Sequence, residues 1–212
     1  MSKLRPEYLK VMDFDPASQL AGYYHTLRAQ VDFAAARLGA RALSVVSGAQ
    51  GEGRSATAIN LALAYARAGK KTLLIDSDLR KPSLHDILQL SRRDGLSEYL
   101  SRAIPAAQII KETDYPNMQI VTSGSLPPNP TELLSSQRYE QLIAFAKEQY
   151  DRIVVDTSPL MASADAQIVV SQTDGVLLVA EHAKTTRHQL QRTSGLIEQI
   201  GRPVLGTVIN KA

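Results

Sequence analysis

Six short apolar segments alternate with stretches of helical periodicity along most of this chain. The segments are residues 42–47, 71–76, 118–122, 152–156, 175–180 and 204–209. Most are apolar at consecutive positions, which is typical of parallel strands that helices cover on both faces. We therefore predict an α/β fold with a doubly wound, mostly parallel sheet and helices on both faces.

The segments between these strands have apolar residues three and four positions apart, which predicts helices over residues 55–68, 136–150 and 185–200. A further helical pattern with apolar positions from Leu20 to Leu38 precedes the first strand. The sequence PPNPTELL indicates one more helix start, with Asn129 as the cap and Pro130 in the first turn. Residues 1–17 are polar and contain two prolines, so we expect a flexible arm there and one domain over residues 18–212.

The composition excludes several classes of protein. The chain has no cysteine, so neither a disulfide framework nor a cysteine-based metal site can form. The net charge is only +3 and no long basic block occurs, so we expect no nucleic-acid partner. No apolar run approaches the roughly 18 residues of a transmembrane helix, and the N-terminus does not resemble a secretory signal. We expect a cytoplasmic protein that only a partner would bring to the inner face of the cell membrane.

The glycine-rich sequence GAQGEGRSA lies between the first predicted strand and the helix that follows it. It matches the phosphate-binding loop pattern G-x-x-x-x-G-K-[ST] at Gly48, Gly53 and Ser55, but Arg54 stands at the lysine position. In such a loop the backbone amides and the helix N-terminus bind phosphate, and the Ser55 hydroxyl binds Mg²⁺. A glycine-rich turn that only tightens the strand–helix junction is the alternative. The predicted nucleotide contacts are Gly48, Ala49, Gln50, Gly51, Glu52, Gly53, Arg54, Ser55 and Ala56.

Three carboxylates follow two of the predicted strands. Asp76 and Asp78 come at the end of the second strand, and Asp156 ends the fourth. The carboxyl ends of parallel strands meet at the edge where such folds bind ligands. A single aspartate after a strand usually caps a helix or forms a turn, but three of them beside a phosphate-binding loop favour a metal–nucleotide site. We predict that Ser55, Asp78 and Asp156 hold Mg²⁺.

Together these residues resemble the cytoplasmic P-loop kinase domain of the bacterial tyrosine kinases that control capsule and exopolysaccharide synthesis. The resemblance covers residues 20–211, which is nearly the whole chain. Its most specific parts are LLIDSDLRKP and PPNPTELL, because a phosphate-binding loop alone occurs in many unrelated NTPases. The segments YDRIVVDTSPL and VLGTVINK also match.

The resemblance implies ATP-dependent transfer of phosphate to protein tyrosines, with Mg²⁺ as the second cofactor. It implies that Asp76 takes the proton from the tyrosine hydroxyl, with Arg54 and Asp78 as further catalytic residues, and that Asn210 contacts adenine. Arg80 is expected to meet phosphate or acidic neighbours. The resemblance also implies a membrane polysaccharide co-polymerase whose cytosolic tail activates the kinase, and self-association in rings.

The sequence departs from the family pattern in the phosphate-binding loop and in its tyrosines. Arginine is a broad planar fork where lysine is a compact point charge, so we expect Arg54 to preserve nucleotide binding better than catalysis. No tyrosine follows Tyr150, so the family's tyrosine-rich C-terminal tail is not in this sequence. Tyr8 is the candidate acceptor that remains, because Tyr23 and Tyr24 are expected to pack on a helix face.

The first predicted helix also departs from the family pattern. The family's ring contact uses a Glu-x-x-Arg-x-x-Arg pattern, and the aligned positions here are Gly22, His25 and Arg28, so only the last matches. A stable ring is therefore not predicted, although self-association remains open.

Two other functions remain open from the residues. Arg54, Ala56 and the absent tyrosine tail are compatible with a pseudokinase that senses nucleotide or acts as a scaffold for polysaccharide assembly. A partitioning or division-site ATPase would have the same fold, but those proteins carry an extra lysine early in the loop, where this chain has Ala49.

Overall fold

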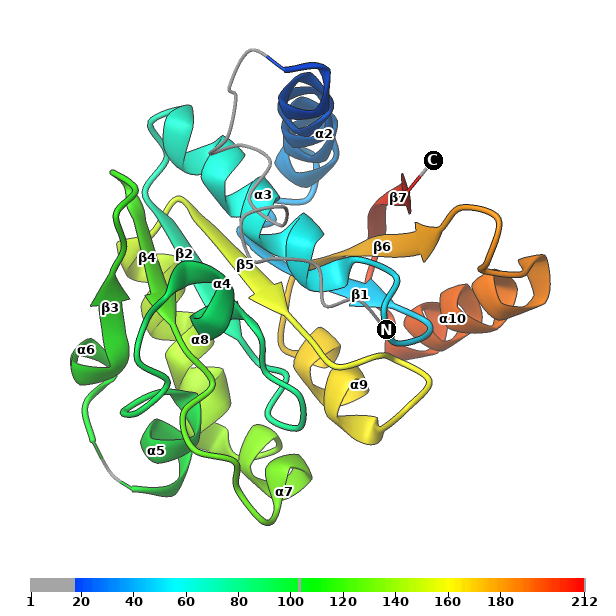
Figure 1. Ribbon diagram of the computed structural model, residues 1–212. Helices are drawn as coiled ribbons and strands as arrows, with labels where there is room; N and C mark the ends of the chain where they lie inside the picture. Colours follow the sequence, from blue (N-terminus) through cyan, green and yellow to red (C-terminus); the bar gives the residue numbers. More distant parts are fainter. Residues whose placement is uncertain (1–17, 103, 212) are drawn as a thin grey trace.

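The computed structural model describes residues 18–102 and 104–211, so the expected arm and Tyr8 lie outside the described residues. Within that part of the chain one seven-stranded sheet forms the centre, in the order β3-β4-β2-β5-β1-β6-β7 (Figure 1). All neighbouring strands are parallel except β3, which pairs antiparallel with β4 at one edge. The predicted α/β fold with a mostly parallel sheet is confirmed. The strands are β1 (Ala42–Ser47), β2 (Thr72–Asp76), β3 (Ile110–Glu112), β4 (Met118–Val121), β5 (Arg152–Asp156), β6 (Gly175–Glu181) and β7 (Val204–Asn210).

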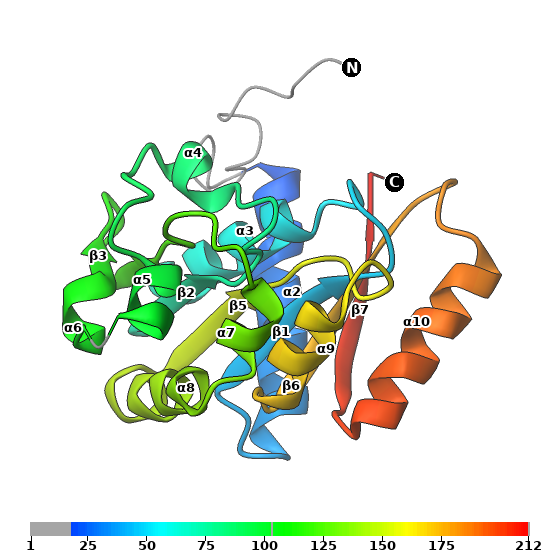
Figure 2. The ribbon, with the colours of Figure 1, turned by 90° about the horizontal axis from the view of Figure 1, so that it is seen from below.

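Helices cover both faces of the sheet, as Figures 1 and 2 show from two directions. One face carries α2 (Gln19–Ala36), α3 (Arg54–Arg67) and α4 (Leu84–Leu88). The other face carries α5 (Leu96–Ser101), α6 (Ala106–Ile109), α7 (Pro130–Leu134), α8 (Gln137–Gln149), α9 (Ala164–Ser171) and α10 (Arg187–Ile200).

The consecutive apolar residues of the central strands supply both cores. In β5, Val154 packs with α2 and α3 on one face, while Ile153 and Val155 pack with α8 on the other, and none of the three is exposed. Burying one such side chain contributes about 1.5–3 kcal/mol. The centre of the sheet, where the strands that carry the predicted site residues lie, is therefore held firmly from both sides.

Several elements differ from the sequence prediction. The strand β3 and the short helices α4, α5, α6 and α9 were not predicted, because segments of three to eight residues are too short to display a periodicity. Helix α10 begins at Arg187 because Thr186 caps it, accepting a hydrogen bond from the backbone N–H of Gln189. Pro130 lies in the first turn of α7 as predicted, but Asn129 makes no side-chain cap. Its amide donates to the Glu132 carboxylate instead, 3.1 Å away.

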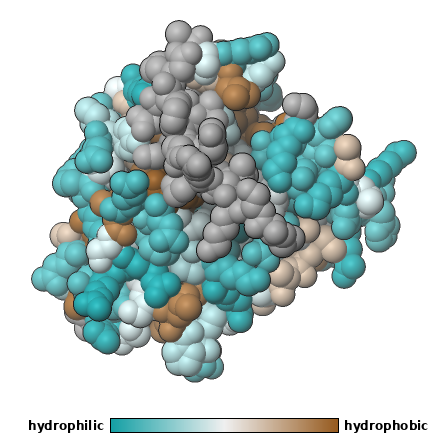
Figure 3. All heavy atoms as spheres, in the orientation of Figure 1, coloured by the Kyte–Doolittle hydropathy of each residue, from teal (hydrophilic) through white to brown (hydrophobic). Residues whose placement is uncertain are grey.

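On the face drawn in Figure 3 the coloured surface is mainly hydrophilic, and the apolar side chains on it are scattered. Helix α2 exposes several, including Phe33. Tyr23 is 60% exposed, so the expectation that it packs against the domain is wrong, whereas Tyr24 packs against the core as expected. Among the described residues, none of the helices has the length and apolar character needed to cross a bilayer.

Candidate functional site

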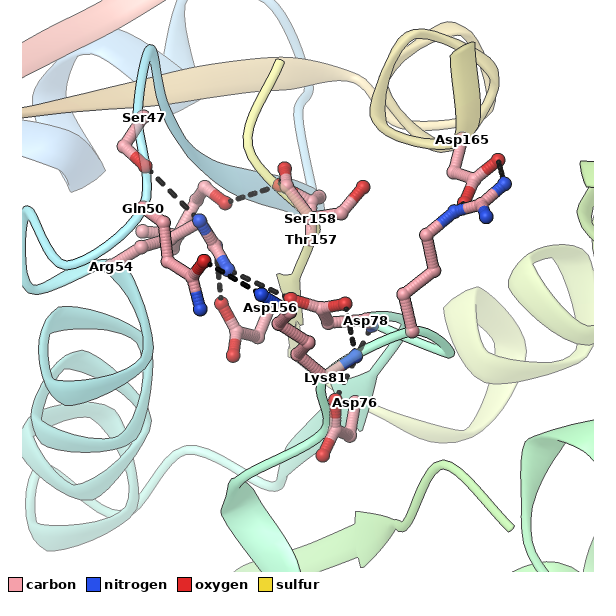
Figure 4. A network of polar contacts seen from close by, with 12 residues as sticks. Ser47, Gln50, Arg54, Asp76, Asp78, Lys81, Asp156, Thr157, Ser158 and Asp165 are labelled. Atoms are coloured by element: carbon pink, nitrogen blue, oxygen red, sulfur yellow. Dashed lines mark hydrogen bonds and ion pairs between the residues drawn. The ribbon is translucent and has the colours of Figure 1, made fainter. Parts of the chain in front are cut away.

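The predicted site residues come from the carboxyl ends of three adjacent central strands. β1 and β2 both pair with β5, and the register places Asp76 beside Asp156. The loop of residues 48–53 leaves β1 at the same edge and leads into α3. Figure 4 shows the side chains of Arg54, Asp78 and Asp156 pointing toward one another at this edge. The convergence that the sequence predicted is present.

The glycine-rich loop has a backbone that only glycine adopts without strain. Gly51 and Gly53 have φ values of +86° and +93°. A Cβ atom at Gly53 would lie 1.6 Å from Nδ2 of Asn210, so any side chain there would displace the Asn210 amide. Helix α3 begins at Arg54, directly after Gly53. The first amides of a helix have no partner within it, and together with the helix dipole they make an anion-binding end.

Glu52 braces this loop from the inside. Its side chain is buried and accepts a hydrogen bond from the backbone N–H of Ala49 at 2.8 Å, as well as one from the Thr185 hydroxyl. Asn210 donates to the Glu52 carbonyl oxygen at 3.1 Å, and Lys211 donates to the Gly51 carbonyl oxygen at 2.9 Å. Glu52 therefore shapes the loop with its side chain, a role that the motif pattern did not suggest. This role could have been predicted from the sequence, because an acidic side chain in a loop expected to bind anions has to turn away from them.

Arg54 lies between two of the predicted metal ligands. Its Nε donates to Oδ1 of Asp156 and its Nη2 donates to Oδ2 of Asp78, both at 3.0 Å. A third bond joins Nη1 to the Ser47 hydroxyl at 3.0 Å. The Arg54 side chain is only 8% exposed. The arginine at the lysine position thus forms a buried ionic network instead of extending into solvent.

Asp156 is fully buried, and its Oδ2 atom receives no hydrogen bond of regular geometry. Burial raises the pKa of this carboxyl, while the Arg54 charge and the Ser55 hydroxyl act to lower it. Ser55, Asp78 and Asp156 are therefore close together, and an oxygen set of this kind suits Mg²⁺, which binds one or two carboxylates and completes its shell with phosphate and water. No group of three or more histidine, aspartate and glutamate side chains among the described residues is placed to hold a metal, so the candidate metal position has two carboxylates, Asp78 and Asp156, and the Ser55 hydroxyl.

Asp76 lies beneath the site. It is fully buried, and its two oxygens accept the backbone N–H groups of Asp78 and Leu84 at 3.3 and 3.2 Å. Burial and the nearby charge of Asp156 raise the pKa of the Asp76 carboxyl well above its usual value. Because β2 ends at Asp76, Asp78 belongs to the following loop and not to a continued strand. Asp76 therefore holds the backbone that presents Asp78.

Two cavities meet at this place. One of about 440 Å³ is lined by α2 and the start of α3 and includes Tyr24, Ser55 and Asn210. The other, of about 370 Å³, is lined by the first loop residues and by the segment after β5. Both are lined by Gln50, Asp78 and Lys81, and neither by Asp76 or Asp156. Asp78 is thus the carboxylate that faces both spaces.

A second ionic contact holds the loop after β2, and its partners Asp165 and Thr131 were not predicted from the sequence. Arg80 Nε donates to Oδ2 of Asp165 in α9 at 2.6 Å, and the Thr131 hydroxyl of α7 donates to Oδ1 of Asp165 at 2.6 Å. Burial acts to raise the pKa of Asp165, but these hydrogen bonds outweigh it and lower the pKa. Thr131 lies in PPNPTELL, one of the segments that carry the family resemblance, and this was the only indication of the contact in the sequence. Arg80 thus meets an acidic neighbour, as one of its two predicted roles requires.

Comparisons with known proteins agree with the fold and the loop. A family described as AAA domain matches residues 40–204. The tyrosine-protein kinase YwqD of Bacillus subtilis (strain 168) is 36% identical over 92% of this chain and 83% of its own length. The septum site-determining protein MinD of Pyrococcus horikoshii, solved with Mg-ADP, has a TM-score of 0.70 at 22% identity and covers 80% of this chain and 69% of its own, so that likeness concerns the fold alone. The chain is an α/β domain of the family described as AAA domain.

Two solved structures are more similar. The chimerical protein CapA2B2 has a TM-score of 0.92 at 31% identity and covers 100% of this chain and 92% of its own. The kinase domain of the Escherichia coli tyrosine kinase ETK has a TM-score of 0.90 at 30% identity, over 95% and 81% of the two chains. This chain belongs to the family of bacterial tyrosine kinases.

Proposed function

We propose that this protein is an ATP-dependent protein-tyrosine kinase that phosphorylates tyrosines, its own included, and regulates exopolysaccharide or capsule synthesis. The observation that carries the proposal is the meeting of the glycine loop, Ser55, Asp78 and Asp156 at the ends of β1, β2 and β5. The relatives named as tyrosine-protein kinases support the choice of acceptor.

We propose that ATP occupies the cavity beside α3. Its phosphates would lie against the loop amides of residues 48–56, and Asn210 at the cavity wall would contact the base. Lys81 and Lys211 add positive charge to the same wall, which favours a polyphosphate. Ser55, Asp78 and Asp156 would hold Mg²⁺, which neutralises charge on the phosphates when it is bound.

The second cavity is the proposed place of the acceptor tyrosine. Asp78 lines both cavities, so it is better placed than Asp76 to meet the incoming hydroxyl and accept its proton. We propose that Asp76 positions Asp78 through the backbone, since both of its oxygens accept main-chain amides. Tyr23 is an exposed candidate acceptor in the described part of the chain.

The proposed partners follow from the family. The cytosolic tail of a membrane polysaccharide co-polymerase would activate the kinase and bring it to the inner face of the membrane. Support comes from the relative named as the chimerical protein CapA2B2, since CapB is also the name of a putative tyrosine-protein kinase of Staphylococcus aureus. For self-association, Arg28 is the single position that matches the family's ring pattern, and here it pairs with Asp32 of the same helix at 3.1 Å.

The test is a phosphotyrosine assay with ATP and Mg²⁺, with and without the tail of a co-polymerase. We expect phosphotyrosine in the unmodified protein and its loss in Asp78→Asn. The control is Asp174→Asn, which removes a carboxylate paired with Lys147 away from the loop. If no phosphotyrosine forms even with the activator, the proposal is wrong and a nucleotide-sensing scaffold is the function to test next.

A further inference from the structure

The contacts of Arg54 have a consequence for metal binding. Its guanidinium separates two buried carboxylates, Asp78 and Asp156, whose side chains are 6% and 1% exposed. Two such anions side by side would repel each other strongly if nothing lay between them. A planar guanidinium with five N–H groups bridges two carboxylates at once, which a single ammonium group does less well. Arg54 therefore does for these carboxylates what a bound cation would do.

The oxygens that Arg54 binds are those a metal would need. Asp78 Oδ2 and Asp156 Oδ1 each accept one of its N–H groups, and Asp78 Oδ1 accepts the backbone N–H of Lys81 at 3.0 Å. Oδ2 of Asp156 is the oxygen of this group without a regular hydrogen bond. A divalent ion without nucleotide would meet the positive charge of Arg54 and one available carboxylate oxygen. Because Mg²⁺ loses its hydration water reluctantly, these contacts favour its binding only weakly.

We propose that Arg54 is a tethered cation that closes the metal position in the nucleotide-free protein and opens it only when nucleotide phosphates draw the guanidinium away. The inference rests on the proposed function, because it concerns the same nucleotide site. Three of the five N–H groups of Arg54 are engaged with protein atoms, which leaves two for phosphate oxygens. Phosphate accepts arginine in a bidentate manner, so the nucleotide offers Arg54 a replacement for the carboxylates it gives up.

The test measures thermal unfolding of the protein with Mg²⁺ alone, against the same ionic strength of NaCl. We expect no change in Tm for the unmodified protein. In Arg54→Ala the carboxylates of Asp78 and Asp156 have lost their guanidinium partner. We therefore expect Mg²⁺ at ~100 times its Kd to raise the Tm of this variant by roughly 5–10 °C. The double variant Arg54→Ala/Asp156→Asn should lose most of that response. Arg152→Ala is the matched control, since it removes a half-buried guanidinium from Asp32 away from the loop and should not create a response.

Two results would overturn the inference: a Tm increase of the unmodified protein with Mg²⁺ alone that equals that of Arg54→Ala, or no response in the folded Arg54→Ala variant. If Arg54→Ala does not fold, the test is Mn²⁺ binding to the unmodified protein, measured by equilibrium dialysis without nucleotide. Binding contradicts the inference, and the absence of binding supports it. Arg54→Lys, which keeps one charge, should then bind Mn²⁺ more tightly than the unmodified protein does.

A parallel titration with Mg-ADP separates this inference from the proposed function. Stabilisation of the unmodified protein by Mg-ADP, together with a Mg²⁺ response of the unmodified protein alone, would overturn the role of Arg54 and leave the nucleotide site intact. Absence of any effect of Mg-ADP on the unmodified protein and on Arg54→Lys would overturn the nucleotide site itself.

Discussion

At Gly53 the backbone of the phosphate-binding loop lies so close to the side chain of Asn210 that an added Cβ atom would displace the Asn210 amide. Gly51, two residues earlier, has a similar φ but open space around it. The two glycines therefore have the same backbone conformation but different neighbours. Alanine at each of the two positions separates the effect of backbone strain from that of the steric clash with Asn210.

We predict that Gly53→Ala destabilises the protein by about 1–3 kcal/mol through the strained φ, and in addition weakens Mg-ADP binding by displacing Asn210. Gly51→Ala should carry only the strain. Urea unfolding and titration with Mg-ADP measure the two effects. Equal loss of nucleotide affinity in both variants would contradict the role given to the Asn210 contact.

The sequence predicted where the loop and its carboxylates would meet, because the motif spacing fixes Ser55 after the loop and strand ends fix Asp76 and Asp156. It did not predict the partners of Arg54. Which carboxylates a long side chain reaches depends on how loops from two strands fold over it. The contact between Arg80 and Asp165 was missed for the same reason, since 85 positions separate the two residues.

Among the elements, α5 is held to the end of β4 by one carboxylate. Glu98 Oε2 accepts the backbone N–H of Gly95 at 2.9 Å, and Oε1 accepts that of Ser125 at 2.9 Å. Burial acts to raise the pKa of Glu98, but these hydrogen bonds outweigh it and lower the pKa to about 2. A carboxyl whose pKa is lower in the folded state than in the unfolded state stabilises the fold above its unfolded pKa. The contribution disappears as the pH falls toward the folded pKa.

We predict that Glu98→Gln lowers the free energy of unfolding at pH 7 by about 1–2 kcal/mol, after allowance for solvent screening. The difference from the unmodified protein should shrink as the pH falls from 4.5 to about 2. Urea unfolding across this range is the measurement, with Glu140→Gln of the exposed side of α8 as the control. A difference that stays constant with pH would show that the ionised carboxylate is not what holds the loop.

The longer elements were predictable and the short ones were not. Helix α3 and the strands on either side of it carry enough apolar residues to display their period. Between β2 and β4, the described residues 77–102 and 104–113 form three short helices and β3, and each of these depends on contacts with the sheet more than on its own sequence.

At the scale of the whole molecule, the order of the strands decides how stability is distributed. β5 lies between β2 and β1 with helices above and below, whereas β3 and β7 lie at the two edges. The alternation of strands and helices in the sequence predicted a sheet with helices on both faces. It did not predict the order of the strands in the sheet, because a buried strand has the same run of apolar residues whichever strands it pairs with.

We predict that the amides of β5 exchange with solvent only through global unfolding, and that those of β3 and the outer edge of β7 exchange through local opening with a lower free energy. Native-state hydrogen exchange at increasing urea concentration resolves the two groups. Equal protection of β3 and β5 would mean that the described domain opens as a single unit.

The hydrogen bonds from Asn210 and Lys211 to the carbonyl oxygens of Glu52 and Gly51 join the outermost strand to the loop at the middle of the sheet. A fluorophore, affinity tag or fusion partner attached after residue 211 would therefore disturb the loop of the proposed nucleotide site, although the attachment point is remote from that loop along the chain. Assays with such attachments need an untagged reference sample.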